Sequence, residues 1–340
     1  MRAWVSHGAG LERLQLDERP VLPPAAGQVL LRMRAASVAL RDHKMALGAY
    51  GSGDAYGPRV LGGEGVGEVV ECGEGVQRWR VGQRVNPLFV QGWTGVRVQS
   101  DTVDRSTLGG NFVDGCFAEF MQVPQASLVA VPEHLSDAEA ATLPFAGLTA
   151  WCALHEQAGI HAGDVVVVQG TGGIPLFALQ FAKQAGALVI VTSKNDAKLE
   201  QARALGADHT LNYQALPEWS LAVLELTQGR GADVVIDPGG CVTMAQSLRA
   251  LRPGGTVCVV GALGASPDLA VPLPWLLGHN LRVQGSHAGS LQAHRAMAAA
   301  VAASGMRPVI ERCMPFADAA LAIAAAPKAE QFGKVCLEMD

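Results

Sequence analysis

A run of four valines leads directly into a glycine-rich turn, an arrangement suited to holding a phosphate group. The run, Val165–Val168, is followed by Gln169-Gly170-Thr171-Gly172-Gly173-Ile174-Pro175. Gly170 permits a tight turn, and Gly172 lets a pyrophosphate approach the backbone. The helix that follows offers unpaired N–H groups and a partial positive charge of about half an elementary unit. The segment therefore predicts a dinucleotide site formed by Gly170, Thr171, Gly172, Gly173 and Ile174.

An ordinary tight turn between a strand and a helix is the alternative interpretation of this motif. Pro175 replaces the third glycine of the usual pattern. Proline is acceptable at the first position of a helix, where its missing N–H has no partner to lose. The strand before the turn and the repeated strand–helix units after it favour the nucleotide-binding interpretation.

The end of the next strand indicates which dinucleotide is bound. An NAD site usually places an acidic residue about 20 residues beyond the turn, where it accepts a hydrogen bond from the ribose 2′-hydroxyl. This region reads Val191-Thr192-Ser193-Lys194-Asn195, with no carboxylate before Asp196. Because Ser193 and Lys194 would stabilise a 2′-phosphate, the sequence predicts NADP(H) rather than NAD(H). The alternative is that Lys194 is a solvated loop residue and that Asn195 or Asp196 caps the next helix.

Alternating strands and helices surround these residues and must position them. Apolar runs such as Val257–Val260 lack the polar alternation of a half-exposed strand, which suits a parallel sheet covered on both faces. The repetition predicts an α/β domain with a doubly wound, six-stranded parallel sheet. The expected strands are 165–169, 188–192, 209–211, 234–237, 256–261 and 281–284, and the expected helices are 176–184, 196–205, 217–227 and 243–251.

The residues on either side of this domain follow a different pattern. The first third has short apolar runs at 2–6, 29–36, 66–70, 81–87 and 117–123, separated by glycine and proline, with one helix expected at 40–47. Helical segments are expected within Ala138–Gly159. After Gly289, a helix, strand, helix and strand are expected at 291–303, 309–314, 318–325 and 334–337. This tail is too short to be a domain, so we expect it to pack against the first third.

The composition argues against several partners and locations. The formal charge of −5 and the pI of about 6.0 disfavour a nucleic-acid or anionic-membrane surface. The seven cysteines are scattered without a Cys-x-x-Cys, which disfavours a disulfide framework and indicates a reducing compartment. No signal peptide is evident, and every long apolar stretch is interrupted. We therefore expect a cytoplasmic protein whose partner is a small-molecule substrate.

Several stretches, taken in order, resemble the medium-chain dehydrogenase/reductase superfamily and together extend over nearly the whole chain. They are Leu61–Val70, Val81–Val85, Ala140–Trp151, Gln169–Gly173, Leu205–His209, Leu251–Gly255 and Phe332–Val335. The resemblance implies a GroES-like, mainly β catalytic domain formed by residues 1–148 and 288–340. It implies a Rossmann domain formed by residues 149–287, and an NAD(P)H-dependent enzyme. It further implies a homodimer in which residues 271–285 join two sheets edge to edge.

Many members of this superfamily bind a catalytic zinc ion, but this chain departs from their ligand pattern. Zinc members carry a Cys near the position of Leu40–Arg41, a His at the position of Gly63 and often a Cys at the position of Phe145. A catalytic zinc needs about three protein ligands, which Glu64 alone does not supply. The four-cysteine structural zinc lobe is also missing, because residues 91–111 contain no Cys. We therefore expect no metal.

The chain is consequently similar to the zinc-free branch, which includes quinone oxidoreductases and related NADPH-dependent enone and carbonyl reductases. In that branch, Tyr213 corresponds to a residue that packs on the adenosine 2′-phosphate, although a tyrosine that only closes a strand is the alternative. Gly261-Ala262-Leu263 and Gly285-Ser286 match strand ends that flank the nicotinamide. Lys334, in the last matching stretch, is assigned to the same site. Quinone oxidoreductases often have an Asn at the position of Ala39, so their substrate contacts do not transfer directly.

A metal-free pocket must stabilise a developing oxyanion through hydrogen bonds or water. Arg41, Asp42 and Tyr50 are the candidate catalytic residues, and Tyr50 is the candidate proton donor. The structural alternative for Asp42 is an ion pair with Arg41 or Lys44 that fixes the helix. Tyr50 and the neighbouring His43 also have structural alternatives. Glu64 is expected to anchor its loop by hydrogen bonds.

Three functions remain open from the sequence. The first is a zinc-independent oxidoreductase that transfers a hydride between NADP(H) and a small quinone, enone or carbonyl compound. The second is a zinc-free NAD(P)-dependent alcohol or aldehyde dehydrogenase. The third is a non-catalytic NADPH-binding protein. The missing zinc ligands favour the first over the second, because activating an alcohol without a metal is harder.

Overall fold

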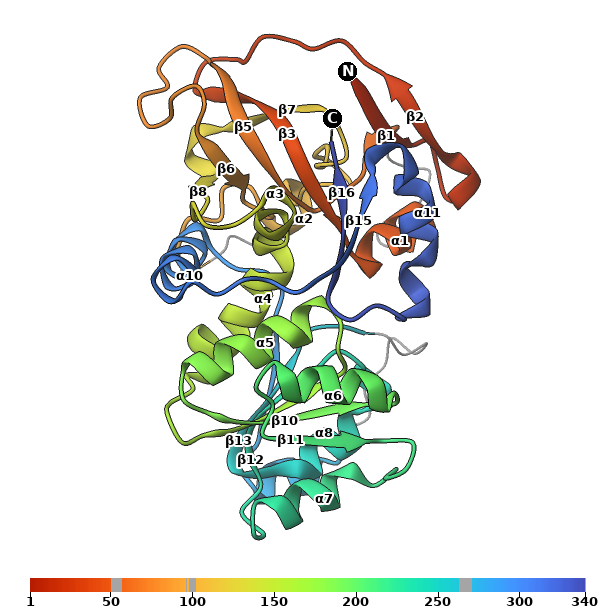
Figure 1. The fold of residues 1–340 in the computed structure, drawn as a ribbon, viewed down its shortest axis with the longest axis vertical. Helices are drawn as coiled ribbons and strands as arrows, with labels where there is room; N and C mark the ends of the chain where they lie inside the picture. The colour runs from red at the N-terminus through yellow and green to blue at the C-terminus, as the bar shows by residue number, and fades with distance from the viewer. Residues whose placement is uncertain (50–56, 96, 98–101, 263–270, 340) are drawn as a thin grey trace. The chain divides into compact units, whose positions relative to one another are not determined.

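The chain divides into two compact units, which are described separately below. The computed structural model describes residues 1–49, 57–95, 97, 102–262 and 271–339. Unit 1 comprises Met1–Leu148 and Ala288–Asp340, and unit 2 comprises Thr149–His287 (Figure 1). Within the described ranges, no helix has both the length and the apolar character needed to cross a membrane.

Unit 2 is a Rossmann fold built on a six-stranded parallel sheet, as the alternation of strands and helices predicts. The sheet order is β11-β10-β9-β12-β13-β14, so successive strands are added in one direction from β9 to β11 and in the other from β12 to β14. This is the strand order of a doubly wound dinucleotide-binding domain. The strands are β9 (Val165–Gln169), β10 (Leu188–Ser193), β11 (His209–Asn212), β12 (Ala232–Asp237), β13 (Leu251–Val259) and β14 (Arg282–Gly285).

Helices connect these strands and supply apolar side chains to the core. They are α5 (Gly173–Gln184), α6 (Asp196–Ala204), α7 (Trp219–Leu226), α8 (Met244–Ala250) and α9 (Leu273–Gly278), preceded by the π-helical segment Cys152–Ala158. The core includes Val167, Ile190, Val235 and Val257 from neighbouring strands. The observed β13 begins at Leu251 rather than Thr256, because Ala232 of β12 also pairs with Leu251 across a register shift.

Unit 1 is a GroES-like domain with one three-stranded and one seven-stranded sheet. The first has the order β2-β1-β4, with strands Leu14–Glu18, Arg2–Ser6 and Arg59–Val60. The second has the order β15-β16-β3-β5-β6-β8, and β7 also pairs with β3. Its strands are β3 (Gln28–Val38), β5 (Glu64–Cys72), β6 (Arg84–Pro87), β7 (Phe120–Pro124), β8 (Leu128–Ala130), β15 (Ile310–Pro315) and β16 (Lys334–Glu338).

The C-terminal tail completes unit 1, as expected. Strand β16 pairs antiparallel with β3, and β15 pairs parallel with β16, so the tail extends the N-terminal sheet (Figure 1). Helices α10 (Leu291–Ser304) and α11 (Ala319–Ala325) lie in this tail, and α1 (Leu40–Ala46), α2 (Thr102–Ser106) and α3 (Asp137–Ala141) lie in the N-terminal part. A π-helical segment, Leu143–Gly147, separates α3 from α4 (Leu148–Trp151).

Candidate active site

The glycine turn after β9 presents uncovered backbone at the carboxyl end of the sheet in unit 2. Gly170 has a φ of +83°, and its N–H donates to the Thr192 carbonyl at 2.7 Å, which ties the turn to β10. No heavy atom lies within 4 Å of the position that a Cβ would take on Gly172. Helix α5 begins at Gly173, and Pro175 is its third residue, where an N–H would have no intrahelical partner. The turn therefore has space and N–H donors for a pyrophosphate.

The residues expected at the adenosine end of the dinucleotide lie where β10 and β11 end. Ser193 is paired with Asn212 in the sheet register, and the Tyr213 N–H donates to the Ser193 carbonyl at 3.1 Å. Lys194 is exposed, and Tyr213 is 40% exposed. The backbones of Ser193 and Tyr213 are thus joined at these strand ends, and Lys194 directly follows Ser193.

Asn195 and Asp196, the two residues considered as caps of α6, have different hydrogen-bond partners. The Asn195 side chain accepts a hydrogen bond from the Lys198 N–H at 3.1 Å and so caps α6. Asp196 accepts a hydrogen bond from the Asn212 side chain at 2.8 Å. The cap is therefore made by Asn195, which leaves Lys194 available to an anion.

The strand ends expected to flank the nicotinamide pack closely at the carboxyl edge of the same sheet. A Cβ on Gly261 would lie 2.9 Å from the Pro238 carbonyl oxygen, so the backbone after β13 crosses the loop after β12 at close range. Ala262 lies against Gly240 in the same contact. Ser286 is buried, its N–H donates to the Val259 carbonyl at 2.9 Å, and its hydroxyl bonds the Gln157 side chain. Gly285 ends β14, with open space around its Cα.

Asp237, which the sequence reasoning did not single out, organises the loop after β12. Its carboxylate is fully buried and accepts from the N–H groups of residues 239–240 at 2.8 and 2.9 Å. It also accepts from the hydroxyls of Thr243 and Ser247, both at 2.6 Å, and from the Gln169 side chain at 3.3 Å. An Asp at the end of a buried strand followed by Pro-Gly-Gly was the available signal. The carboxylate fixes the loop against which Gly261 packs.

In unit 1, Lys334 and Glu64 form a buried ion pair. The Lys334 ammonium donates to Glu64 Oε1 at 2.6 Å and to the Val38 carbonyl at 3.0 Å. Glu64 Oε2 accepts from the N–H groups of Phe145 and Ala146 at 3.2 and 3.0 Å. Glu64 therefore anchors its loop as expected. Lys334, assigned to the cofactor by resemblance, neutralises this carboxylate in the structure.

Arg41 and Asp42 lie on α1 in different environments. Arg41 is half-buried, with its guanidinium carbon 5.1 Å from the centre of the Phe89 ring. Asp42 is 1% exposed and accepts a hydrogen bond from the Ala39 N–H at 2.8 Å. Burial raises the pKa of Asp42 to about 6, although Arg41, the Ala39 N–H and Lys334 each lower it. The charge on Arg41 thus helps to keep a buried carboxylate ionised near neutral pH.

The positions that hold zinc ligands in zinc members are filled by other groups here. A Cβ on Gly63 would lie 2.7 Å from Phe89 Cε2 and 3.5 Å from Arg41 Nη1. The Phe89 and Phe145 rings are 4.6 Å apart. A histidine at position 63 would therefore require Phe89 to move. Within the described residues, no group of three His, Cys, Asp or Glu side chains is arranged to hold a metal.

Cys116 is near enough to Asp42 and Glu64 to be affected by their charges, but it is not suited to metal binding. It is fully buried, and its burial, together with Asp42 and Glu64, raises the pKa of its thiol far above the ordinary range. Zinc binds the thiolate form of cysteine, which these surroundings disfavour. Among the described residues of unit 1, Cys116 therefore offers no ready thiolate to a metal ion.

Two of the predicted residues lie outside the described ranges. These are Tyr50, the candidate proton donor, and Leu263, assigned to the nicotinamide. His43, next to Asp42, has its Nδ1 3.0 Å from the Ile323 carbonyl of α11, which supports the structural interpretation of this histidine.

Family models and relatives identify what the chain is similar to. A model described as "Alcohol dehydrogenase GroES-like domain" matches residues 25–133, and one described as "Zinc-binding dehydrogenase" matches residues 173–303. A zinc-type alcohol dehydrogenase-like protein of Schizosaccharomyces pombe is 36% identical over 340 residues, which cover 98% of this chain and 97% of the relative. The similarity thus spans both units.

Solved structures extend the similarity to three differently described proteins. An NAD-dependent alcohol dehydrogenase is 32% identical, with full coverage of both chains (100% each) and a TM-score of 0.90. A mycobacterial protein complexed with NADPH is 26% identical, with 100% coverage of both chains and a TM-score of 0.83. A quinone oxidoreductase of Pseudomonas syringae pv. tomato DC3000 is 28% identical, with 100% coverage of both chains and a TM-score of 0.83.

Proposed function

We propose that this protein catalyses a zinc-independent reaction with NADP(H). The chain belongs to the medium-chain dehydrogenase/reductase superfamily and is an NAD(P)-dependent oxidoreductase. Its substrate in this proposal is a small quinone, enone or other carbonyl compound. The observation that carries the proposal is the replacement of a zinc-ligand position by Gly63, with Phe89 and Arg41 filling the adjoining space. The substrate oxygen must then be polarised by protein donors instead of a Lewis acid.

Arg41 is the group proposed to polarise the substrate. A nicotinamide, when bound, supplies the hydride that adds to the carbonyl carbon or to the β-carbon of an enone. The negative charge that develops on oxygen would be stabilised by the Arg41 N–H donors, whose charge persists at every relevant pH. A proton from solvent or from the candidate donor Tyr50 completes the alcohol or the saturated ketone. Asp42, the buried neighbour of Arg41 on α1, is proposed as a positioning residue.

NADP(H) is proposed as the cofactor because of the side chains gathered where β10 and β11 end. Ser193, Lys194 and Tyr213 offer donors to a 2′-phosphate, and the first carboxylate beyond them, Asp196, is held by Asn212. The structural neighbour complexed with NADPH supports this choice, whereas the neighbour described as NAD-dependent supports NAD(H). The proposal therefore rests on the local chemistry of this chain.

An alcohol or aldehyde dehydrogenase is the second candidate, because two of the similar proteins carry that description. It differs from the first candidate in the direction of hydride transfer and in the type of substrate. A non-catalytic NADPH-binding protein is set aside, because the chain belongs to a superfamily of enzymes.

The deciding experiment follows NADPH oxidation with quinones, 2-enones and aldehydes, and NADP+ reduction with alcohols, each with and without a zinc chelator. We expect quinone or enone turnover that the chelator leaves unchanged. Arg41→Gln should lower kcat/KM by roughly a hundredfold or more while leaving NADPH binding intact. Arg13→Gln, which removes an exposed charge from the same unit, is the control. Reduction of NADP+ by alcohols alone would favour the second candidate, and loss of turnover on zinc removal would overturn the first.

We also propose that the protein is a homodimer joined at the free edge of the unit 2 sheet. The edge strand β14 is exposed along its whole length, and no residue of α9 is buried. Leu273 and Leu277 of α9 are 62% and 74% exposed, and Val283 of β14 is 37% exposed. A second copy paired along β14 would satisfy the open strand edge and cover these apolar side chains.

A reducing, cytoplasmic location is proposed on the state of the cysteines. All seven are free thiols, and four of them are buried. Disulfides form and persist mainly in oxidising compartments. Measurement of thiol content after purification without reductant, together with fractionation of cells, tests this location.

A further inference from the structure

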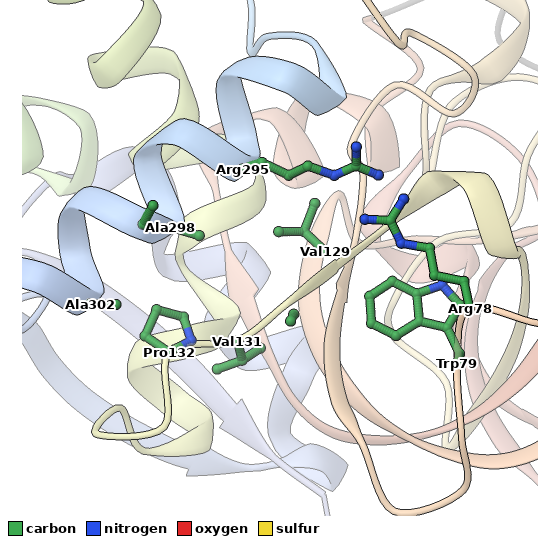
Figure 2. A pocket seen from close by; sticks show the side chains of 10 residues that line it. Arg78, Trp79, Val129, Val131, Pro132, Arg295, Ala298 and Ala302 are labelled. Atoms are coloured by element: carbon green, nitrogen blue, oxygen red, sulfur yellow. The ribbon is translucent and has the colours of Figure 1, made fainter.

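Unit 1 contains a pocket that is separate from the candidate active-site residues. It lies among Arg78 and Trp79 in the loop between β5 and β6, the end of β8 and the following residues 131–132, and one face of α10 (Figure 2). Its volume is about 310 Å³, at the lower end of small-molecule sites, which are roughly 300–1,000 Å³. The pocket suits a ligand of few heavy atoms.

Two guanidinium groups face the pocket, and none of the described residues that line it carries a carboxylate. Figure 2 shows Arg78 and Arg295 extending over Val129 from opposite walls. Within the part of the chain that the structure describes, Nε of Arg295 is buried without a hydrogen-bond partner. Burial and the charge of Arg78 lower the pKa of Arg295. Two like charges held close together are unfavourable unless an anion lies between them.

The rest of the pocket is apolar and preformed. Val129 and Val131 are 4% and 9% exposed, and Pro132 lies beside them. Trp79 is held by a 2.8 Å hydrogen bond from its indole N–H to the Gln125 carbonyl, so its ring presents carbon atoms to the pocket. Alanines 298 and 302 of α10 leave the space open, because they have no larger side chain to fill it.

We propose that this pocket binds a small amphipathic organic anion. Its carboxylate or phosphate head accepts hydrogen bonds from Arg78 and Arg295, since guanidinium groups match the geometry of both anions. Its short aliphatic or aromatic body packs on Val129, Val131 and Trp79. The arginine side of the pocket suits the charged head and the apolar side suits the body. An inorganic anion or an uncharged hydrocarbon would therefore occupy only one of the two sides. This site belongs wholly to unit 1 and does not depend on the proposed reaction.

The test measures binding of hexanoate to the full-length protein by titration calorimetry, with hexanol, acetate and inorganic phosphate as matched probes. We expect hexanoate to bind with a clear excess over each of the other three. Arg78→Gln and Arg295→Gln should each weaken hexanoate binding by about tenfold or more. Arg249→Gln, which removes an exposed charge in unit 2, should leave hexanoate binding unchanged.

Further arms separate this pocket from the candidate active site. Arg41→Gln should retain hexanoate binding; loss of binding in that variant with retention in Arg295→Gln would place the ligand elsewhere and overturn the proposal. Phosphate binding as tight as hexanoate would show a site for anions alone, which also overturns it. Hexyl phosphate in place of hexanoate distinguishes a phosphate head from a carboxylate head. NADPH turnover of each variant reports separately on the proposed reaction.

Discussion

Lys334 and Glu64, 270 residues apart in the chain, form an ion pair of 2.6 Å with side chains 6% and 1% exposed. The pair joins β16 in the C-terminal tail to the start of β5 in the N-terminal part. Each charge has further partners, the Val38 carbonyl for the ammonium and two backbone N–H groups for the carboxylate. A buried pair held by these hydrogen bonds fixes one arrangement of these strands, although its net contribution to stability is small.

Removing one partner of this pair should therefore cost far more than removing both. Glu64→Gln leaves the buried Lys334 ammonium without the carboxylate to which it is hydrogen-bonded, and we expect a loss of about 3–5 kcal/mol in the free energy of unfolding. The double variant Glu64→Gln/Lys334→Met should recover much of that loss. Denaturant unfolding of the single and double variants measures it. Glu200→Gln breaks an exposed pair with Arg203 and should change stability by less than about 1 kcal/mol. Additive losses in the double variant would contradict the prediction.

Lys194→Ala should separate the two nicotinamide dinucleotides. Lys194 is exposed where β10 ends, so its loss should remove a charge-assisted contact with the 2′-phosphate and leave the rest of the turn intact. We expect NADPH binding to weaken by about tenfold to a hundredfold, with NADH binding little changed. Fluorescence titration with each dinucleotide measures this. Arg203→Ala, on the following helix, controls for the change in net charge. Equal weakening for both dinucleotides would defeat the NADP assignment.

A charge on the free edge of the Rossmann sheet should dissociate the proposed dimer. Val283 lies in the centre of β14, so Val283→Lys would place an ammonium against its counterpart across the two-fold axis. Sedimentation equilibrium should change from dimer to monomer while the far-ultraviolet circular dichroism is retained. Leu321→Lys, at a 66% exposed position on α11, is the matched control and should stay dimeric. A wild-type protein that is monomeric at micromolar concentration would rule out the dimer.

His294 should make the protein sensitive to mild acid. It is fully buried on α10, and within the described ranges neither ring nitrogen has a hydrogen-bond partner. Burial, and then the charge of Arg295, lowers its pKa from 6.5 to about 3. Between those values the unfolded chain binds a proton that the folded chain does not, so stability falls as pH falls below 6.5.

The variant His294→Leu should lose this sensitivity. At pH 5 the histidine costs the wild-type protein about 2 kcal/mol relative to neutral pH, and the leucine variant should be spared that loss. Urea unfolding at pH 7 and pH 5 compares the two proteins. His161→Gln, whose side chain is 85% exposed in the wild type, should retain the wild-type pH dependence. Equal acid destabilisation in the leucine variant would assign the effect to other groups.

The sequence alone determined the fold class and the glycine turn, because both depend on local properties of the chain. The apolar run Val165–Val168 indicates a strand buried on both faces, and repeated strands and helices allow few topologies. The turn requires a positive φ, which is +83° at Gly170, and a glycine in the sequence indicates that such a conformation is possible there. The departure from the zinc-ligand pattern at Gly63 was likewise visible as a residue type. For the same reason, Ser193 and Lys194 could be placed at the end of β10 from their order alone.

Only the tertiary structure decided which groups meet across long stretches of chain. The sheet pairing of β16 with β3 places the Lys334 ammonium on Glu64, a contact that the sequence did not indicate, and the assignment of Lys334 to the cofactor stays a prediction. Phe89 and Arg41 fill the space beside Gly63, and Asp237 gathers donors from three segments of unit 2. Such contacts depend on how sheets and helices pack, and burial then sets whether a charge is neutralised or its pKa moves. The order of residues in the chain indicates neither the packing nor the burial directly.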